Sequence, residues 1–208
     1  MTRTITAVLA AAVIVLVSAG CGATPEASTP PVVTETPRAL PTPEVEVPVT
    51  AATLTPAVPD VPPVRVAVSS VDIDVPVVPV GIEPGGFMEL DPNPAVAGWY
   101  RFGADPTSGD GNVVISAHVD APEYPIGPFS RLRDLGAGAE VSVTDAAGTT
   151  HRYRVDSVTY YRKTDLPVDE LFARQGSRDL VLITCGGEYD PSVGRYRDNV
   201  VTIATPVD

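Results

Sequence analysis

The chain has 208 residues, 44% of them hydrophobic and 19% charged, which is enough apolar material for a globular core. Its formal net charge of −12 argues against nucleic acid or anionic lipid as a partner of its exposed surface. Two histidines and two cysteines form no cluster with metal-ligand spacing, and no glycine-rich nucleotide motif is present, so we expect no cofactor.

The N-terminal segment, residues 1–21, predicts export. One arginine precedes an apolar run from Ile5 to Ala19, which is short for a stable transmembrane helix. Ser18-Ala19-Gly20-Cys21 resembles a bacterial lipobox, in which lipid is attached to the cysteine, although Ser18 stands where Leu is usual. A lipid anchor at Cys21, an uncleaved membrane anchor and free secretion stay open. All three place the rest of the chain outside the cytoplasm, and the two anchors place it on the outer face of the cell membrane.

Residues 22–63 are rich in Thr, Val and Pro. Proline fixes φ and removes a hydrogen-bond donor, so a helix or a sheet interior is excluded there. The segment predicts an extended, semi-rigid spacer that holds a domain away from the membrane. Residues 64–208 then form that domain.

From residue 64 onward, short runs with period-two alternation and many β-branched residues predict strands. Predicted strands cover 64–68, 71–80, 112–116, 140–144, 151–161, 180–185 and 199–204, and two short helical patches cover 129–135 and 168–174. Glycine- and proline-containing turns separate these runs. Many short strands with little helix indicate an all-β barrel or sandwich.

Cys185 ends the apolar strand 180–184 and is followed by Gly186-Gly187. If Cys21 is lipidated or removed, Cys185 has no partner within the chain, which suggests a reactive thiol or an intermolecular bridge. A buried small hydrophobe is the alternative. The position at a strand end, beside glycines that let a ligand backbone approach closely, favours a functional thiol.

His118 follows the end of strand 112–116 in a similar way. Histidine is the usual acid or base at neutral pH, although a surface loop histidine is the alternative. His151 lies inside a polar, alternating strand, and we expect it to be a solvated position without a catalytic role.

Arg195 and Arg197 precede the last strand. A guanidinium that points back toward Cys185 would suit a developing oxyanion. A surface salt bridge is the alternative for each arginine.

The order of His118 after a strand, then Ile183-Thr184-Cys185, then Arg197 before a terminal Val-rich strand resembles the sortase family. The segment 112–120 is similar to the sortase segment that carries the histidine. The resemblance spans nearly all of residues 64–204 and implies an eight-stranded sortase β-barrel with one or two short helices.

Three further stretches are similar to class F sortases of high-GC Gram-positive bacteria, the actinobacteria. They are Gly98-Trp99-Tyr100, residues 129–135 and residues 196–201. In this pattern the family arginine is the one in Arg-Asp-Asn, which is Arg197.

The resemblance implies a cysteine transpeptidase that cleaves a sorting signal of the Leu-Pro-x-Thr-Gly kind. Cys185 would form a thioacyl-enzyme, His118 would act as the general acid, and Arg197 would stabilise the oxyanion, with Arg195 in reserve. Thr184 would help to position the substrate, and the loop 162–176 would form the groove wall. The acceptor would be an amine of a cell-wall precursor or a pilin Lys.

Two other functions stay open at this point. A surface lipoprotein with this β domain can bind a peptide without catalysis, because fold does not guarantee chemistry. A cysteine hydrolase on the same barrel would use water as the acceptor.

Overall fold

The computed structural model describes residues 59–207. The export segment 1–21, including Cys21, and residues 22–58 of the predicted spacer lie outside the described residues. Within 59–207, no helix has the length and apolarity needed to cross a membrane.

Eight strands dominate the described chain, which confirms the predicted all-β fold. The strands are β1 (Pro63–Val68), β2 (Ile73–Val80), β3 (Ala97–Tyr100), β4 (Val113–Ser116), β5 (Glu140–Asp145), β6 (Thr150–Arg162), β7 (Leu180–Asp190) and β8 (Arg195–Pro206). The helices are the 3₁₀ turns η1 (Ser69–Val71) and η2 (Pro128–Asp134) and the short α1 (Val168–Leu171).

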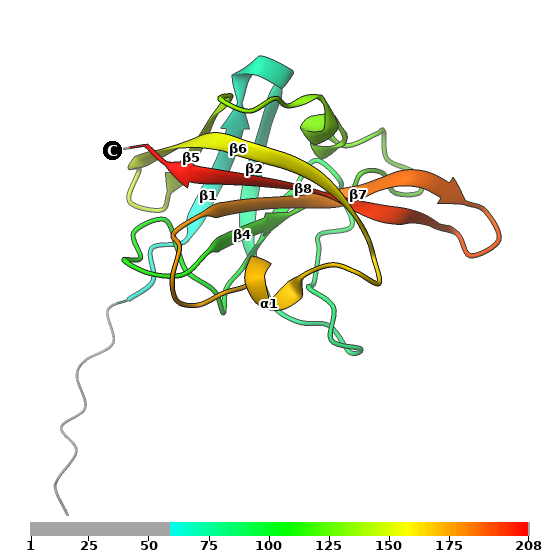
Figure 1. Cartoon of the computed structure of the whole chain (residues 1–208), viewed down its shortest axis with the longest axis horizontal. Coiled ribbons are helices and arrows are strands. Elements are labelled where there is room, and N and C mark those ends of the chain that lie inside the picture. Colours follow the sequence, from blue (N-terminus) through cyan, green and yellow to red (C-terminus); the bar gives the residue numbers. More distant parts are fainter. Residues whose placement is uncertain (1–58, 208) are drawn as a thin grey trace, which may run out of the picture. The chain divides into compact units, whose positions relative to one another are not determined.

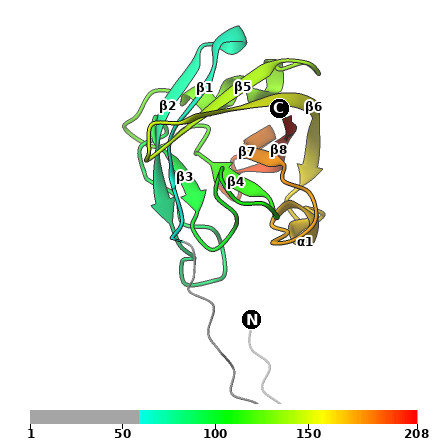
Figure 2. The same cartoon turned by 90° about the vertical axis from the view of Figure 1, so that its left-hand side faces the viewer.

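The strands close into one barrel in the order β1-β2-β3-β4-β7-β8-β6-β5, and β5 pairs back onto β1. The pairs β2–β3 and β4–β7 are parallel, and the other pairs are antiparallel. Figure 1 shows β6, β8 and β7 side by side, and Figure 2 shows the strands curving around the interior. Closure leaves no strand along the ring without a neighbour on each side.

Strands β4 and β7 are buried on both faces. Val113 and Ile115 face the main core inside the barrel, whereas Val114 belongs to a second cluster with Leu171 of α1. β7 alternates in the same way between the two clusters. A strand covered on both faces has a continuous apolar sequence instead of an alternating one, which explains the two apolar runs that precede His118 and Cys185.

Two predicted strand ends are wrong, because β7 continues beyond Cys185 to Asp190 and β8 begins at Arg195. Gly186 pairs with Asp198 and the register shifts between Gly186 and Tyr189, so Gly187 lies in a bulge within the strand and not in a turn. At Gly187 φ is +74°, and a Cβ there would lie 2.2 Å from Asp198 Oδ2. Close packing of the hairpin therefore requires glycine at this position.

β3 was not predicted as a strand. It has only four residues, none of them β-branched, and Gly98 stands inside it. A Cβ at Gly98 would lie 2.9 Å from both Val80 methyl carbons, so the glycine allows β2 and β3 to pack.

Candidate active site

The parallel pairing of β4 with β7 brings His118 and Cys185 to the same end of the barrel. Ser116 pairs with Ile183, so both functional candidates lie two residues beyond a paired position. The Ser116 hydroxyl and the Ala117 N–H both donate to the Ile183 carbonyl, at 2.9 Å and 3.2 Å. The chain leaving β4 is thereby fixed against β7 directly before the thiol.

Thr184 strengthens the same junction. Its side chain is buried, and its hydroxyl donates to the Ala117 carbonyl oxygen at 2.8 Å. This bond holds the residue before His118 against the residue before Cys185. A role for Thr184 in positioning the substrate stays a prediction, and the residue does line a cavity beside Cys185.

Cys185 lies where two cavities meet. One cavity, of about 820 Å³, extends between the segment after His118 and the β7–β8 hairpin. The other, of about 410 Å³, extends toward α1. Three residues line both cavities: His118, Lys163 and Cys185. A free thiol and an imidazole at this junction are accessible from two directions.

The cavity toward α1 is mainly apolar on its walls. Residues 163–172 of the predicted groove wall contribute to it, together with the segment before β3. Its apolar lining residues are Phe87, Met88, Leu90, Leu166, Val168, Phe172 and Ile183. Such a surface can accept apolar side chains of a peptide whose backbone passes Cys185.

Lys163 is a site residue that the sequence analysis missed. It directly follows β6, and its ammonium nitrogen lies 3.4 Å from Cys185 Sγ. In sequence it stands beside Arg162 at the end of a polar strand and has no motif of its own. Only the pairing of β6 with β8, and of β8 with β7, brings it to the thiol.

The two candidate arginines lie on one strand face with the thiol. Cys185 pairs with Asn199, and Arg197 and Arg195 stand two and four residues before it on β8. Residues at alternate positions share a face, so both arginines lie on the face of Asn199.

Their side chains differ in environment. Arg195 lines the 820 Å³ cavity with His118 and Cys185. Arg197 forms an ion pair with Glu188, with 3.1 Å between Nη1 and Oε2, and its side chain is 58% exposed. Arg197 does not line either cavity at the junction. The structure therefore brings His118, Cys185 and Arg195 into one cavity, whereas Arg197 lies outside the lining of both cavities.

Tyr196 forms a second bridge across the larger cavity. Its hydroxyl donates to Asp120 Oδ2 at 2.6 Å, linking β8 to the segment that follows His118. This hydrogen bond, with a smaller contribution from burial, raises the pKa of Tyr196 to about 12. The Tyr189 ring packs edge-on at 5.2 Å between centroids, so this wall of the cavity is aromatic.

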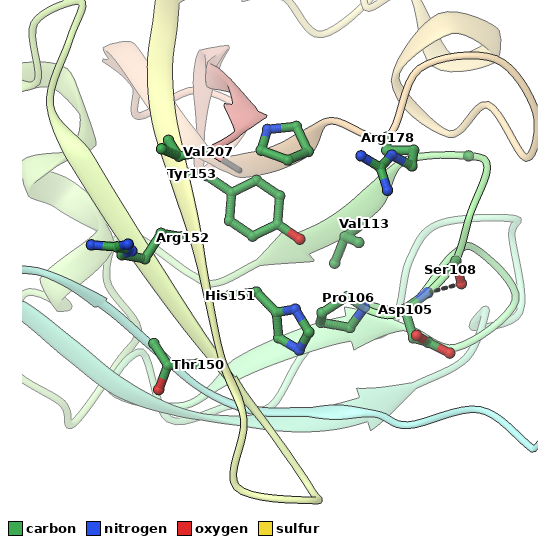
Figure 3. Close-up of a pocket in the computed structure, with 12 residues that line it drawn as sticks. Asp105, Pro106, Ser108, Val113, Thr150, His151, Arg152, Tyr153, Arg178 and Val207 are labelled. Carbon is green, nitrogen blue, oxygen red and sulfur yellow. Dashed lines mark hydrogen bonds between the residues drawn. The ribbon is translucent and has the colours of Figure 1, made fainter.

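His151 lies in a separate cavity of about 310 Å³ that shares no lining residue with the two at Cys185 (Figure 3). Its Nε2 lies 2.8 Å from Asp145 Oδ2, and Asp145 is only 2% exposed. The His151 side chain is 22% exposed, so it is only partly solvated, and the buried carboxylate binds its imidazole. Tyr153 and Arg178 line the same cavity.

Across residues 59–207, no three His, Cys, Asp or Glu side chains gather as metal ligands.

A family model described as the sortase domain matches residues 66–207. The lid mutant of sortase C1 from Streptococcus agalactiae has a TM-score of 0.52 and 16% identity, covering 69% of this chain and 68% of that one. Sortase C-1 from Actinomyces oris gives 0.51 and 18%, covering 69% and 73%. A mutant of sortase C-1 from Streptococcus pneumoniae gives 0.51 and 19%, covering 69% and 65%. The search of curated proteins found no match.

At these low identities the solved structures support only the fold. The family assignment follows from the sortase-domain family model, which matches well over half of the chain. Sortases are cysteine transpeptidases associated with the cell envelope. The closed eight-stranded barrel, in which β4 and β7 end side by side, agrees with the sortase fold. The chain belongs to the sortase family.

Proposed function

We propose that this sortase cleaves a Leu-Pro-x-Thr-Gly-like sorting signal and transfers the acyl part to an amine. The observation that carries the proposal is the junction of two cavities at His118 and Cys185. A peptide in the apolar cavity can present its carbonyl to the thiol, while the larger cavity leaves a route for an acceptor.

In the first step, the Cys185 thiolate attacks the carbonyl carbon of the scissile peptide bond. A C–S bond forms, the carbonyl oxygen gains the negative charge, and the C–N bond then breaks. His118 donates a proton to the leaving amine. The product is a thioester at Cys185 and a free C-terminal fragment.

In the second step, the acceptor amine attacks the thioester carbonyl and His118 takes up a proton from it. A new C–N bond forms, the C–S bond breaks, and the thiolate is regenerated. Water in place of the amine gives hydrolysis through the same intermediate.

The oxyanion requires a donor near the thiol. We assign this role to Arg197, with Arg195 as the reserve. For Arg197 to act, its guanidinium leaves the ion pair with Glu188 and binds the oxyanion instead. Both side chains are exposed, which permits this change of partner. Arg195 already lines the cavity with Cys185 and needs no such exchange.

We further place the enzyme in class F and on the outer face of the membrane. The class rests on the stretches around Trp99 and Arg197 in the sequence. The anchor rests on the apolar segment before Cys21, either lipidated or retained, with residues 22–63 as the spacer. The acceptor is an amine of a cell-wall precursor or a pilin Lys.

The test incubates the detergent-solubilised full chain with a Leu-Pro-x-Thr-Gly peptide, with and without an added amine such as triglycine. Mass spectrometry follows the products, and Cys185→Ala is the control. An amine adduct that requires Cys185 is expected. Cleavage without an adduct in the presence of amine would identify a hydrolase, and the absence of any reaction would contradict the proposed substrate class.

A further inference from the structure

Lys163 is the one residue of the cavity junction to which the proposed mechanism gives no role. It lines both cavities, as His118 and Cys185 do. Its ammonium nitrogen lies 3.4 Å from Cys185 Sγ, which is hydrogen-bonding distance for an N–H donor to sulfur. A contact of this kind is strong when the sulfur is anionic, because both partners are then charged.

The backbone fixes where this lysine begins. The Lys163 N–H donates to the Arg197 carbonyl at 3.2 Å, and Arg162 pairs with Asp198, so the residue is held at the edge of β8. On the other side of β8, Cys185 pairs with Asn199. The long side chain of Lys163 therefore reaches across one strand to the thiol.

The charge of Lys163 is available for this contact. The ion pairs among residues 59–207 involve Arg65, His151 and Arg197, and none involves Lys163. The nearest acidic residue in sequence, Asp165, accepts a hydrogen bond from Thr164 at 2.7 Å. Of the two arginines at the site, Arg195 lines the larger cavity with Lys163, and Arg197 is paired with Glu188.

We propose that Lys163 is a catalytic residue whose ammonium stabilises the Cys185 thiolate. Lys163 donates no proton to the substrate, and its charge stays unchanged throughout the cycle. In the resting enzyme the cation raises the fraction of thiol present as the nucleophile. In the second step the same cation favours departure of the thiolate when the C–S bond of the thioester breaks. The second role rests on the proposed transpeptidase function, whereas the first does not.

The first experiment measures the alkylation of Cys185 by iodoacetamide, a neutral reagent, in the full chain. Mass spectrometry of the Cys185 peptide separates this reaction from that of Cys21. We expect Lys163→Met to slow alkylation at pH 7 by about five- to tenfold, because an exposed cation at this distance acts in a water-like dielectric.

Two further variants separate charge from shape. Lys163→Arg keeps the cation and should restore the rate at pH 7 to within about twofold of the wild type. Arg154→Met removes another exposed cation of β6, which lines neither cavity at the thiol, and should behave like the wild type. Circular dichroism confirms that each variant is folded, since residue 163 is exposed.

The outcomes distinguish this inference from the proposed function. Equal alkylation of the wild type and Lys163→Met across pH 6–10 would overturn the inference, whatever the peptide assay gives. A Lys163-dependent alkylation rate in an enzyme that does not process sorting-signal peptides would support the inference and contradict the proposed function. With an active enzyme, Lys163→Met should also lower turnover, and Lys163→Arg should restore it.

Discussion

Each of two cavities on this barrel carries a histidine, but the two histidines have different partners. His118 lies beside a free thiol, and its ring makes no hydrogen bond within residues 59–207. His151 is bound to the buried carboxylate of Asp145. The His118 ring is therefore placed to exchange protons with a substrate at the thiol, whereas the cavity that holds His151 contains no thiol.

The carboxylate of Asp145 links the His151 side chain to the turn between β5 and β6. Burial raises the pKa of its carboxyl, but hydrogen bonds from His151 and from the N–H groups of Thr149 and Ala147 outweigh burial, so the pKa lies below its usual value. These bonds close the turn between β5 and β6. The ionised form of Asp145 therefore stabilises the fold.

The largest expected effect comes from the nucleophile. Cys185→Ala should lower peptide cleavage by about 10⁴-fold or more, since residues 59–207 hold no other thiol. Tyr153→Phe, in the His151 cavity, should leave the rate within twofold. Steady-state cleavage of a fluorogenic sorting-signal peptide measures both, and a substantial rate in Cys185→Ala would contradict the assignment.

The two histidines give the next contrast. His118→Ala should lower the cleavage rate by about 10²- to 10⁴-fold with little change in stability. His151→Leu should leave the rate nearly unchanged but lower the free energy of unfolding by about 1–3 kcal/mol, because a buried carboxylate oxygen loses its partner. Urea unfolding and the peptide assay on both variants provide the measurement. If His151→Leu instead lost activity while His118→Ala lost only stability, the reaction would take place in the His151 cavity, and the assignment of His118 would be wrong.

Replacing the arginine that reaches the oxyanion with Ala should lower turnover by about 10²- to 10³-fold. If it is Arg197, Glu188→Gln should raise turnover by a few-fold, because the guanidinium is freed from its ion pair. Arg195→Ala would then have a smaller effect. A large loss in Arg195→Ala, with Arg197→Ala and Glu188→Gln near wild-type turnover, would assign the role to Arg195.

Acid sensitivity tests the Asp145 network. Its pKa is lowered in the folded state, so its contribution to stability is present above the unfolded value of about 3.9 and is lost as the pH falls through the folded value. The drop in the melting temperature between pH 6 and pH 3 should therefore be smaller in Asp145→Asn, which has no carboxyl to titrate, than in the wild type. An equal drop in both proteins would show that the network does not contribute.

The smallest expected effect is that of Tyr196→Phe. The hydrogen bond to Asp120 links two exposed side chains, so its loss should cost less than about 1 kcal/mol of stability. A change in KM of a few-fold, with kcat retained, would indicate that the bridge shapes the larger cavity. A loss of kcat equal to that of His118→Ala would require a direct role in catalysis instead.

Sequence patterns predicted a β barrel or sandwich with His118 and Cys185 each at a strand end, and the resemblance to sortases implied the closed barrel and the shared site. The structure gives the physical reason, because β4 and β7 are buried on both faces, pair in parallel and end side by side. The patterns did not give β3 or the full length of β7. Gly187 was expected in a turn and Gly98 lay in no predicted strand, whereas the structure uses both glycines for close packing inside the sheet.

The contacts of single charged side chains were not predictable. Lys163 carried no signal in the sequence, and Arg197 was expected either at the oxyanion or in a surface salt bridge. The register across β6, β8 and β7 decides that Lys163 reaches the thiol while Arg197 pairs with Glu188. His151 also depends on a cross-strand neighbour, the turn residue Asp145. Such long-range contacts depend on strand order and bulges, which residue types alone do not specify.

The central claim is that Cys185 carries the acyl group at the cavity junction. The most direct measurement is intact-protein mass spectrometry after rapid acid quenching of a reaction with a Leu-Pro-x-Thr-Gly peptide, followed by peptide mapping. We expect a mass increase equal to the N-terminal fragment, located at Cys185 and removed by hydroxylamine. Product formation without such an adduct, or an adduct that persists in Cys185→Ala, would contradict it.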